Sequence, residues 1–258
     1  MSEVELPRFP NECALVAPED WLPSCNFEPR NNDGTIDLLL LHYTATSTTE
    51  HALELLTTKE GGVSSHYLID EDGRILQLVA ERERAWHAGE AVWDGEVDVN
   101  SCSIGIEIQN QGAALAVLPP YGARQMAAVV ALCQDIVARH NIPAHRVLGH
   151  SDVAPHRKQD PGAHFDWARL ARAGVGLWVE ADGFAPGPCL ALSYAEMKGF
   201  QEKLQTFGYG LQVTGEHDER CRLVVAALQR HFRPERVDGE IDEHTLKVLD
   251  LLLCKMKA

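Results

Sequence analysis

The chain has 258 residues, of which 45% are hydrophobic and 24% are charged, and its formal net charge is -15 at pH 7. This length and composition are typical of a globular protein with one large core and a small second domain, and they argue against disorder. Nucleic acids and anionic membrane surfaces bind clustered Lys and Arg, so the negative charge argues against both as partners. We expect a partner that is neutral or only locally charged.

The N-terminal segment lacks the basic region and the apolar stretch of a secretory signal. The apolar run at residues 38–41 is too short to span a bilayer, so we expect no membrane span. The seven cysteines are odd in number, and none stands in CxxC spacing. We interpret them as reduced thiols, which together with the missing signal favour a cytoplasmic location.

Residues 1–34 are rich in Pro, Asn and charge and predict an irregular lead-in. Residues 35–44 form a continuous apolar run of strand length, which predicts a central strand buried on both faces. His42 falls at the C-terminal end of this strand, where open α/β sheets place their chemistry. Residues 48–58 have apolar side chains at helical spacing and predict a short amphipathic helix.

Residues 64–70 and 74–79 are two strand-like runs joined by Asp72-Gly73, which predicts a hairpin. Residues 81–100 alternate charge, Trp and Gly without a period and predict a long surface loop, a kind of segment that is often functional. Residues 103–110 alternate isoleucines with Gly, Glu and Gln, so Glu107 should lie on the strand face opposite the isoleucines.

Residues 121–140 have apolar side chains at helical spacing and predict a helix that ends before Asn141. Residues 147–148 predict a short strand, and residues 166–173 predict a helix with Asp166 as its N-cap. Strands that alternate with helices, together with one hairpin, predict an α/β fold with a mixed β-sheet flanked by helices.

Residues 181–192 carry two Gly and two Pro and predict a linker. Three helical patterns follow over about 65 residues and predict a small three-helix bundle. We therefore expect a catalytic domain at residues 1–180, the linker at 181–192 and a helical domain at 193–258.

Residues 149–162, GHSDVAPHRKQDPG, contain two candidate metal ligands, His150 and Asp160. A catalytic zinc ion usually takes three protein ligands and leaves the fourth position to water, so a third ligand is expected elsewhere. His42 is the best candidate, because imidazole and carboxylate are ligands that zinc accepts and no thiolate cluster competes for it.

Two further polar residues are suited to hydrolysis at such a site. Glu107 is suited to orient or deprotonate a water, and Lys158 to steady an oxyanion on a carbonyl. The alternatives are a solvated strand face for Glu107 and a surface charge for Lys158.

Six segments, in order over residues 35–175, resemble the zinc N-acetylmuramoyl-L-alanine amidases of the AmpD/AmiD type. They are residues 42–44 (HYT), 64–69 (SSHYLI), 85–89 (AWHAG), 103–110 (SIGIEIQN), 149–152 (GHSD) and 157–162 (RKQDPG). The resemblance implies a mixed sheet with helices on both sides. It also implies hydrolysis of the amide between N-acetylmuramic acid, ordinary or 1,6-anhydro, and L-alanine of the peptidoglycan stem peptide.

The same resemblance implies roles for five residues. The zinc ligands correspond to His42, His150 and Asp160, the general base to Glu107 and the transition-state stabiliser to Lys158. The implied partners are muropeptides and polymeric murein.

Other histidines and polar residues are weaker candidates. His66, Trp86, His87 and Asn110 match family positions near the substrate cleft, where substrate contact, support of the site and simple packing are all open. We expect His156 and His164 to face solvent. The remaining histidines are expected to be structural or at the surface; they are His51, His140, His145, His217, His231 and His244.

The C-terminal segment resembles a three-helix peptidoglycan-binding module, through residues 200–201 (FQ), 208–210 (GYG), 229–234 (QRHFRP) and 238–239 (DG). Such a module implies polymeric murein in the periplasm as the alternative to a cytoplasmic location. Two other functions remain open: a non-catalytic muropeptide recognition protein, and a zinc peptidase that acts within the stem peptide.

Overall fold

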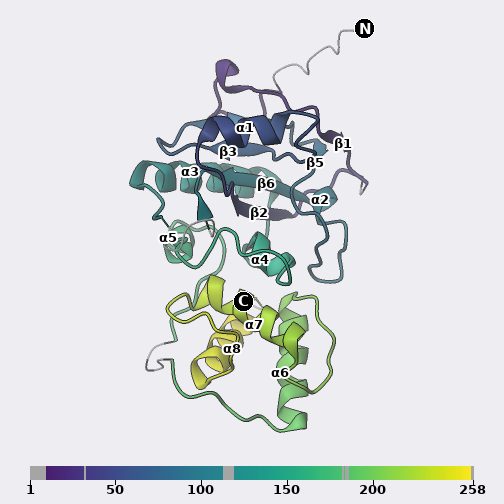
Figure 1. The fold of residues 1–258 in the computed structure, drawn as a ribbon, viewed down its shortest axis with the longest axis vertical. Coiled ribbons are helices and arrows are strands. Elements are labelled where there is room, and N and C mark those ends of the chain that lie inside the picture. Colours follow the sequence, from purple (N-terminus) through teal and green to yellow (C-terminus); the bar gives the residue numbers. More distant parts are fainter. Residues whose placement is uncertain (1–9, 32, 113–118, 182, 184–185, 257–258) are drawn as a thin grey trace.

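The computed structural model of the chain describes residues 10–31, 33–112, 119–181, 183 and 186–256. A mixed five-stranded sheet with flanking helices forms the larger part, and three helices form the smaller part (Figure 1). The predicted α/β fold is therefore confirmed. The strand order is β4-β3-β6-β2-β7, with β2 at Leu38–Tyr43, β3 at Tyr67–Ile69, β4 at Ile75–Gln77, β6 at Ser103–Ile108 and β7 at Val147–Gly149.

The parallel strands of this sheet end at one common edge. Strands β3, β6, β2 and β7 run parallel, and β4 pairs antiparallel with β3 as the predicted hairpin. The register pairs His42 with Glu107, and it pairs Leu41 with Gly149 at the end of β7. Because carboxyl ends of parallel strands face the same side, residues distant in sequence meet at this edge.

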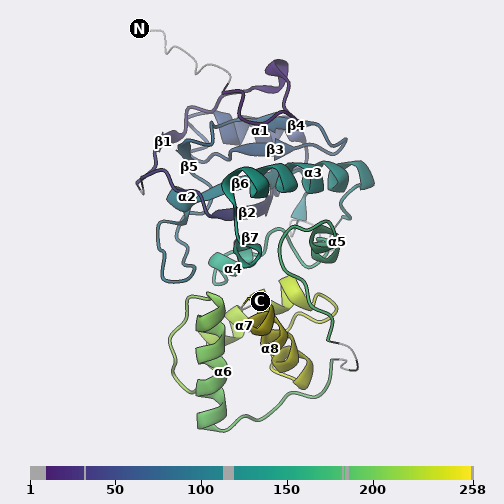
Figure 2. The same ribbon diagram turned by 180° about the vertical axis from the view of Figure 1, so that it is seen from behind.

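Side chains of β2 and β6 alternate between two layers of the protein. Leu39, Leu41 and the β6 isoleucines pack with helices α3 (Ala123–His140) and α5 (Trp167–Arg172). On the opposite face, Leu38 and Leu40 share an apolar cluster with the C-terminal helices, and α1 (Thr49–Thr57) packs on β3 and β4. Figures 1 and 2 show α1 and α3 on opposite sides of the sheet. His42 and Glu107 alternate onto the face that carries α1.

Local capping explains several helix ends. The Thr48 side chain accepts a hydrogen bond from the backbone N–H of His51 at the start of α1, and Asp166 accepts one from Arg169 at the start of α5. Asn141 ends α3 in the left-handed conformation, with φ of 55°. The short elements η3 (Ala144–Arg146) and α4 (His150–Val153) flank β7. No helix among the described residues is long and apolar enough to cross a membrane.

The predictions of a lead-in and a surface loop were wrong in part. The described part of the lead-in contains η1 (Pro18–Asp20) and β1 (Phe27–Pro29), while residues 1–9 and 32 lie outside the described residues. Strand β1 pairs with β5 (Glu83–Ala85) inside the predicted loop, and the last two residues of that loop begin α2 (Val99–Cys102). Trp93 of this loop is fully buried. Strands of three residues are too short to show a hydrophobic period in the sequence. The burial of Trp93 depends on contacts with the distant C-terminal helices, which no local pattern indicates.

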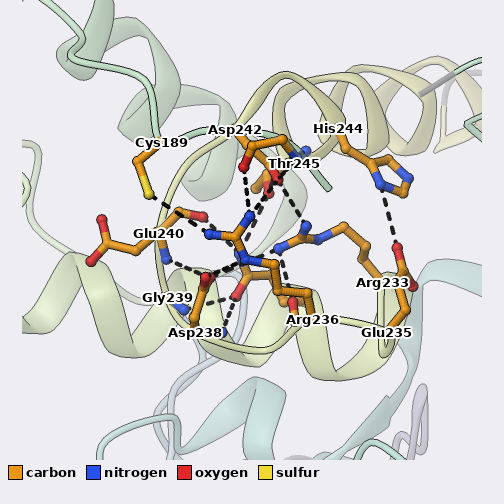
Figure 3. A network of polar contacts seen from close by, with 12 residues as sticks. Cys189, Arg233, Glu235, Arg236, Asp238, Gly239, Glu240, Asp242, His244 and Thr245 are labelled. Carbon is orange, nitrogen blue, oxygen red and sulfur yellow. Dashed lines mark hydrogen bonds and ion pairs between the residues drawn. The ribbon is translucent and has the colours of Figure 1, made fainter. Parts of the chain in front are cut away.

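The three predicted C-terminal helices are present as α6 (Tyr194–Phe207), α7 (Glu219–Phe232) and α8 (Glu243–Met256). Figure 3 shows the polar network that fixes the turn between α7 and α8. The buried Arg233 guanidinium donates to the Asp242 carboxylate at 2.9 Å and to the Arg236 carbonyl at 2.8 Å.

The same network reaches the predicted linker, of which residues 182, 184 and 185 lie outside the described residues. Arg236 donates to the Gly187 carbonyl, and the Gly187 N–H donates to the Asp242 carboxylate at 3.1 Å. The C-terminal end of this segment is therefore attached to the helical part.

Candidate metal centre

Three buried side chains converge at the carboxyl edge of the sheet. His42 Nδ1 lies 2.9 Å from His150 Nδ1, and each of these nitrogens lies 3.0 Å from Asp160 Oδ2. His42 comes from the end of β2, His150 from α4 and Asp160 from the loop that follows α4. The structure thus brings together the three residues that the sequence nominates as metal ligands, in a geometry that can hold a metal ion.

The outer nitrogens of these rings have defined partners. The Nε2 atom of His150 lies 2.9 Å from the Ala88 carbonyl, which can only accept, so this nitrogen carries a proton and Nδ1 is the atom that is free to bind a metal ion. His42 Nε2 lies 3.1 Å from His87 Nδ1. Burial, followed by the neighbouring His150, lowers the pKa of His42 to about 4, so that ring is neutral at pH 7.

A hydrogen-bonded chain behind His42 fixes its tautomer. The Ser103 hydroxyl donates to the Val99 carbonyl at 2.6 Å, so its oxygen is left to accept from His87 Nε2, 3.3 Å away. Burial, followed by His42, lowers the pKa of His87 well below its usual value, so its other nitrogen accepts from His42 Nε2. The chain therefore turns an unprotonated Nδ1 of His42 toward His150 and Asp160.

The converging donor set fits a divalent cation. Asp160 adds its Oδ2 atom, which lies 3.0 Å from Nδ1 of each imidazole ring. Two imidazole lone pairs and a carboxylate oxygen within about 3 Å of one another repel unless a cation lies among them. Two neutral imidazoles and one carboxylate are a ligand set that zinc accepts.

Two glycines allow this packing. A Cβ on Gly105 would lie 2.5 Å from Cγ of the His87 ring, so only glycine leaves room for His87 behind His42. A Cβ on Gly149 would lie 2.7 Å from Cδ of Pro161, next to the Asp160 ligand. The Ser151 N–H donates to the Asp160 carbonyl at 3.0 Å and ties the two ligand segments together.

A pocket of about 200 Å³ opens over the three residues. Glu107, Lys158, Trp86 and His87 line it, and α1 supplies an apolar wall with Leu55 and two neighbours. Burial, followed by the charge of Asp160, raises the pKa of Glu107 well above its usual value. Its Oε2 atom is buried and has no hydrogen-bond partner among the described residues. Glu107 is therefore a buried carboxyl group with raised proton affinity, and it shares the pocket with the metal ligands.

Two other predicted site residues lie away from the pocket lining. His66 is fully buried, where Nδ1 accepts from the Gly105 N–H at 3.0 Å and Nε2 lies 3.1 Å from the Glu83 carbonyl. Asn110 donates to the Pro119 carbonyl at 2.9 Å. Both side chains support loops and strands in this structure.

The two histidines that flank the ligand segment differ in exposure. His156 is exposed, as predicted. The prediction for His164 was wrong, because its ring stacks on Tyr121 with 4.9 Å between centroids and both of its nitrogens are buried.

Sequence reasoning missed Arg157 and Asp152. Arg157 hydrogen bonds to the Ala88 carbonyl and lies 3.4 Å from His150 Nε2. The Asp152 carboxylate is fully buried and accepts from the Gly149 N–H at 2.8 Å. Both residues stand within the segments GHSD and RKQDPG that carry the family resemblance, which was the available signal.

Comparison with known proteins places both parts of the chain. Residues 32–163 match the N-acetylmuramoyl-L-alanine amidase family, and residues 193–249 match a family of peptidoglycan binding domains. The chain is 37% identical to N-acetylmuramoyl-L-alanine amidase AmiD of Escherichia coli K12, across 85% of this chain and 83% of that protein.

Solved structures give the same result. The complex of E. coli AmiD with anhydro-N-acetylmuramic acid-L-Ala-D-gamma-Glu-L-Lys is similar with a TM-score of 0.76, over 85% of this chain and 89% of that one. AMPDH3 of Pseudomonas aeruginosa, 32% identical, also has a TM-score of 0.76, over 92% of this chain and 99% of its own. Matches of this extent, in sequence and in fold, show that the chain belongs to the N-acetylmuramoyl-L-alanine amidase family.

Proposed function

We propose that the chain hydrolyses the amide bond between N-acetylmuramic acid, in its ordinary or 1,6-anhydro form, and L-alanine of the peptidoglycan stem peptide. The observation that carries the proposal is the buried set of His42, His150 and Asp160, with Glu107 beside it in the same pocket. Family membership supports the choice of substrate, since the similar AmiD structure holds an anhydro-muropeptide.

The proposed cofactor is zinc, held by His42 Nδ1, His150 Nδ1 and an oxygen of Asp160. A bound zinc ion would supply Lewis-acid chemistry, which polarises a carbonyl and makes water more acidic. The His87 chain and the Ala88 carbonyl keep the two rings oriented for that ion.

The remaining steps belong to Glu107 and Lys158. We propose that the Glu107 carboxylate takes a proton from the attacking water and later passes it to the leaving amine. Its raised pKa makes it a better proton acceptor than an exposed glutamate. Lys158, on the pocket wall, would place its ammonium near the carbonyl oxygen and stabilise the negative charge that forms there.

Trp86 is the predicted substrate contact that the pocket geometry supports best. Its ring lines the pocket, and its Nε1 atom is buried without a hydrogen-bond partner among the described residues. An N–H group left in this way is suited to donate to a bound substrate. We propose that the main role of His87 is to orient the His42 ring through their hydrogen bond.

We propose that the chain divides into a catalytic domain at residues 1–180, a linker at 181–192 and a peptidoglycan-binding domain at 193–258. The match of residues 193–249 to peptidoglycan binding domains supports binding of muropeptides or polymeric murein by the last of these. The location stays a prediction: the seven free cysteines favour the reducing cytoplasm, and a wall-binding domain favours the periplasm.

The test is mass spectrometry of the products formed from intact sacculi and, separately, from soluble anhydro-muropeptide. Release of complete stem peptides that begin with L-alanine, lost after chelation and restored by zinc, is the expected result. Cleavage inside the stem would instead support the peptidase, and binding without cleavage would support a recognition protein. Activity on sacculi as well as on the soluble substrate would indicate an enzyme that acts on the wall.

A further inference from the structure

Asp152 connects the metal centre to the C-terminal helices. It lies two residues after His150 in α4, and its carboxylate is fully buried. Its Oδ2 atom accepts from the Gly149 N–H at 2.8 Å and pairs with His231 Nδ1 at 2.7 Å, and its Oδ1 atom accepts from the Tyr209 hydroxyl at 2.8 Å. His231 belongs to α7, and Tyr209 follows α6. Figures 1 and 2 show α4 on the side of the sheet part that faces α7.

The two partners of Asp152 are themselves held rigidly. The His231 ring stacks between Trp167 and Phe232, with centroids 3.7 Å away on each side. Tyr209 is 2% exposed and packs edge-on against Trp93, with 5.0 Å between centroids. Stacked and buried rings keep their donor atoms in place, so the position of Asp152 depends on how the C-terminal helices dock.

The backbone next to Tyr209 also contacts the sheet part. The Asp94 N–H donates to the Gly208 carbonyl at 2.7 Å, and a Cβ on Gly208 would lie 2.5 Å from Cε2 of Trp93. The Val92 N–H donates to the Val153 carbonyl, at the end of α4, at 2.8 Å. The segment from Val92 to Asp94 is thus packed between α4 and the C-terminal part.

We propose that Tyr209 and His231 are positioning residues of the metal centre, which hold His150 in place through Asp152. This inference rests on the zinc site proposed above. Helix α4 has only four residues and little stability of its own, so the orientation of His150 depends on what anchors that turn. Asp152 anchors it through Gly149 on one side and the C-terminal helices on the other.

The first test measures zinc affinity of the full chain by competition with a chelator. Tyr209→Phe removes one hydroxyl and leaves a buried oxygen of the Asp152 carboxylate without its donor. We expect the zinc affinity to fall by roughly 3-fold to 10-fold, a smaller loss than is typical when a residue that directly hydrogen bonds to a metal ligand is removed. Tyr67→Phe is the matched control, because Tyr67 is equally buried and its hydroxyl donates to the Glu81 carboxylate at 2.6 Å, away from the pocket lining. Wild-type affinity in Tyr209→Phe, or an equal loss in Tyr67→Phe, would overturn the inference.

A second set of variants tests whether Tyr209 acts through Asp152. We expect the double variant Asp152→Asn with Tyr209→Phe to bind zinc no more weakly than Asp152→Asn alone, whereas additive losses would contradict this route. If circular dichroism shows that Tyr209→Phe is unfolded, two variants of His231 are compared instead. His231→Asn keeps a hydrogen-bond donor for Asp152, and His231→Val does not. Only the valine variant should then lose affinity, and equal affinities would overturn the inference.

The outcome also separates this inference from the proposed function. A wild-type chain that binds no zinc would overturn both. A wild-type chain that binds zinc, with variants that bind it equally well, would overturn only the role of Tyr209 and His231.

Discussion

At the scale of single residues, Glu107 combines a fixed position with an unpartnered carboxylate oxygen. It lies opposite His42 in the sheet register, and it is not one of the three proposed metal ligands. We expect Glu107→Gln to lower kcat by about 10²-fold to 10⁴-fold, the range for loss of a general base, while the zinc content per chain stays unchanged. Glu202→Gln, at an exposed position on α6, is the control and should keep full activity. Normal turnover by Glu107→Gln would remove Glu107 from the mechanism.

His66 shows how a buried neutral ring makes stability depend on pH. Its Nδ1 accepts from the Gly105 N–H, so a second proton on the ring would break that hydrogen bond. Burial, followed by Arg30, lowers the pKa of His66 to about 3. The unfolded chain, with a usual histidine pKa of about 6.5, then binds more protons than the folded chain between pH 6.5 and 3, so stability is lost as the pH falls through this range.

The resulting prediction compares urea unfolding at pH 7 and pH 5. Because His66→Gln cannot titrate, the wild type should lose about 2 kcal/mol more than the variant between these two pH values. All other titrating groups are the same in both proteins, so the difference isolates His66. Equal losses would mean that His66 is protonated in the folded chain at pH 5.

At the scale of secondary-structure elements, β6 supports the metal centre without supplying a ligand. The His87 ring lies directly over Gly105, which has no side chain to displace it. Gly105→Ala should push His87 away from His42 Nε2 and weaken zinc binding by about 10-fold or more, as loss of such a partner typically does. Gly199→Ala on α6, where a Cβ would meet no atom within 4 Å, should leave zinc binding unchanged. Unchanged binding in Gly105→Ala would show that His87 does not orient His42.

The long elements could be predicted from the sequence because their patterns are local. β2 has four consecutive leucines, β6 alternates isoleucines with polar or small residues, and α3 has a clear helical period, so their positions are correct within a few residues. β1 and β5 have three residues each and exist only as partners of one another, which no local pattern reveals.

The same distinction applies to the site. His42, Glu107 and His150 could be placed together because strand ends in one parallel sheet share an edge. The supporting contacts could not be predicted in this way, because the hydrogen bond between Asp152 and Tyr209 joins residues 57 positions apart in two parts of the fold. The wrong expectation for His164 has the same origin, because its burial depends on the distant Tyr121.

At the scale of the whole molecule, one apolar cluster joins the sheet part to the C-terminal helices. It contains Leu38 and Leu40 of β2 together with Phe200 and Leu228 of the helices, and Trp93 lies among them fully buried. Trp93 packs against Phe207 with 5.8 Å between ring centroids, besides its contact with Tyr209. A shared core of this kind predicts that the two parts unfold together, in contrast to domains joined only by a flexible linker.

This coupling gives the last prediction, which differential scanning calorimetry can check. The wild type should unfold in a single transition, and Trp93→Ala should destabilise the chain by about 3–5 kcal/mol, as truncation of a buried aromatic side chain does, and split the transition in two. Leu132→Ala is the control: Leu132 lies on α3, is fully buried and packs in the cluster of the β6 isoleucines, so its loss should lower stability without separating the parts. Two transitions already in the wild type would show that the parts unfold independently. In that case the C-terminal helices could not hold Asp152 once they had unfolded, and zinc should be lost at the lower of the two transitions.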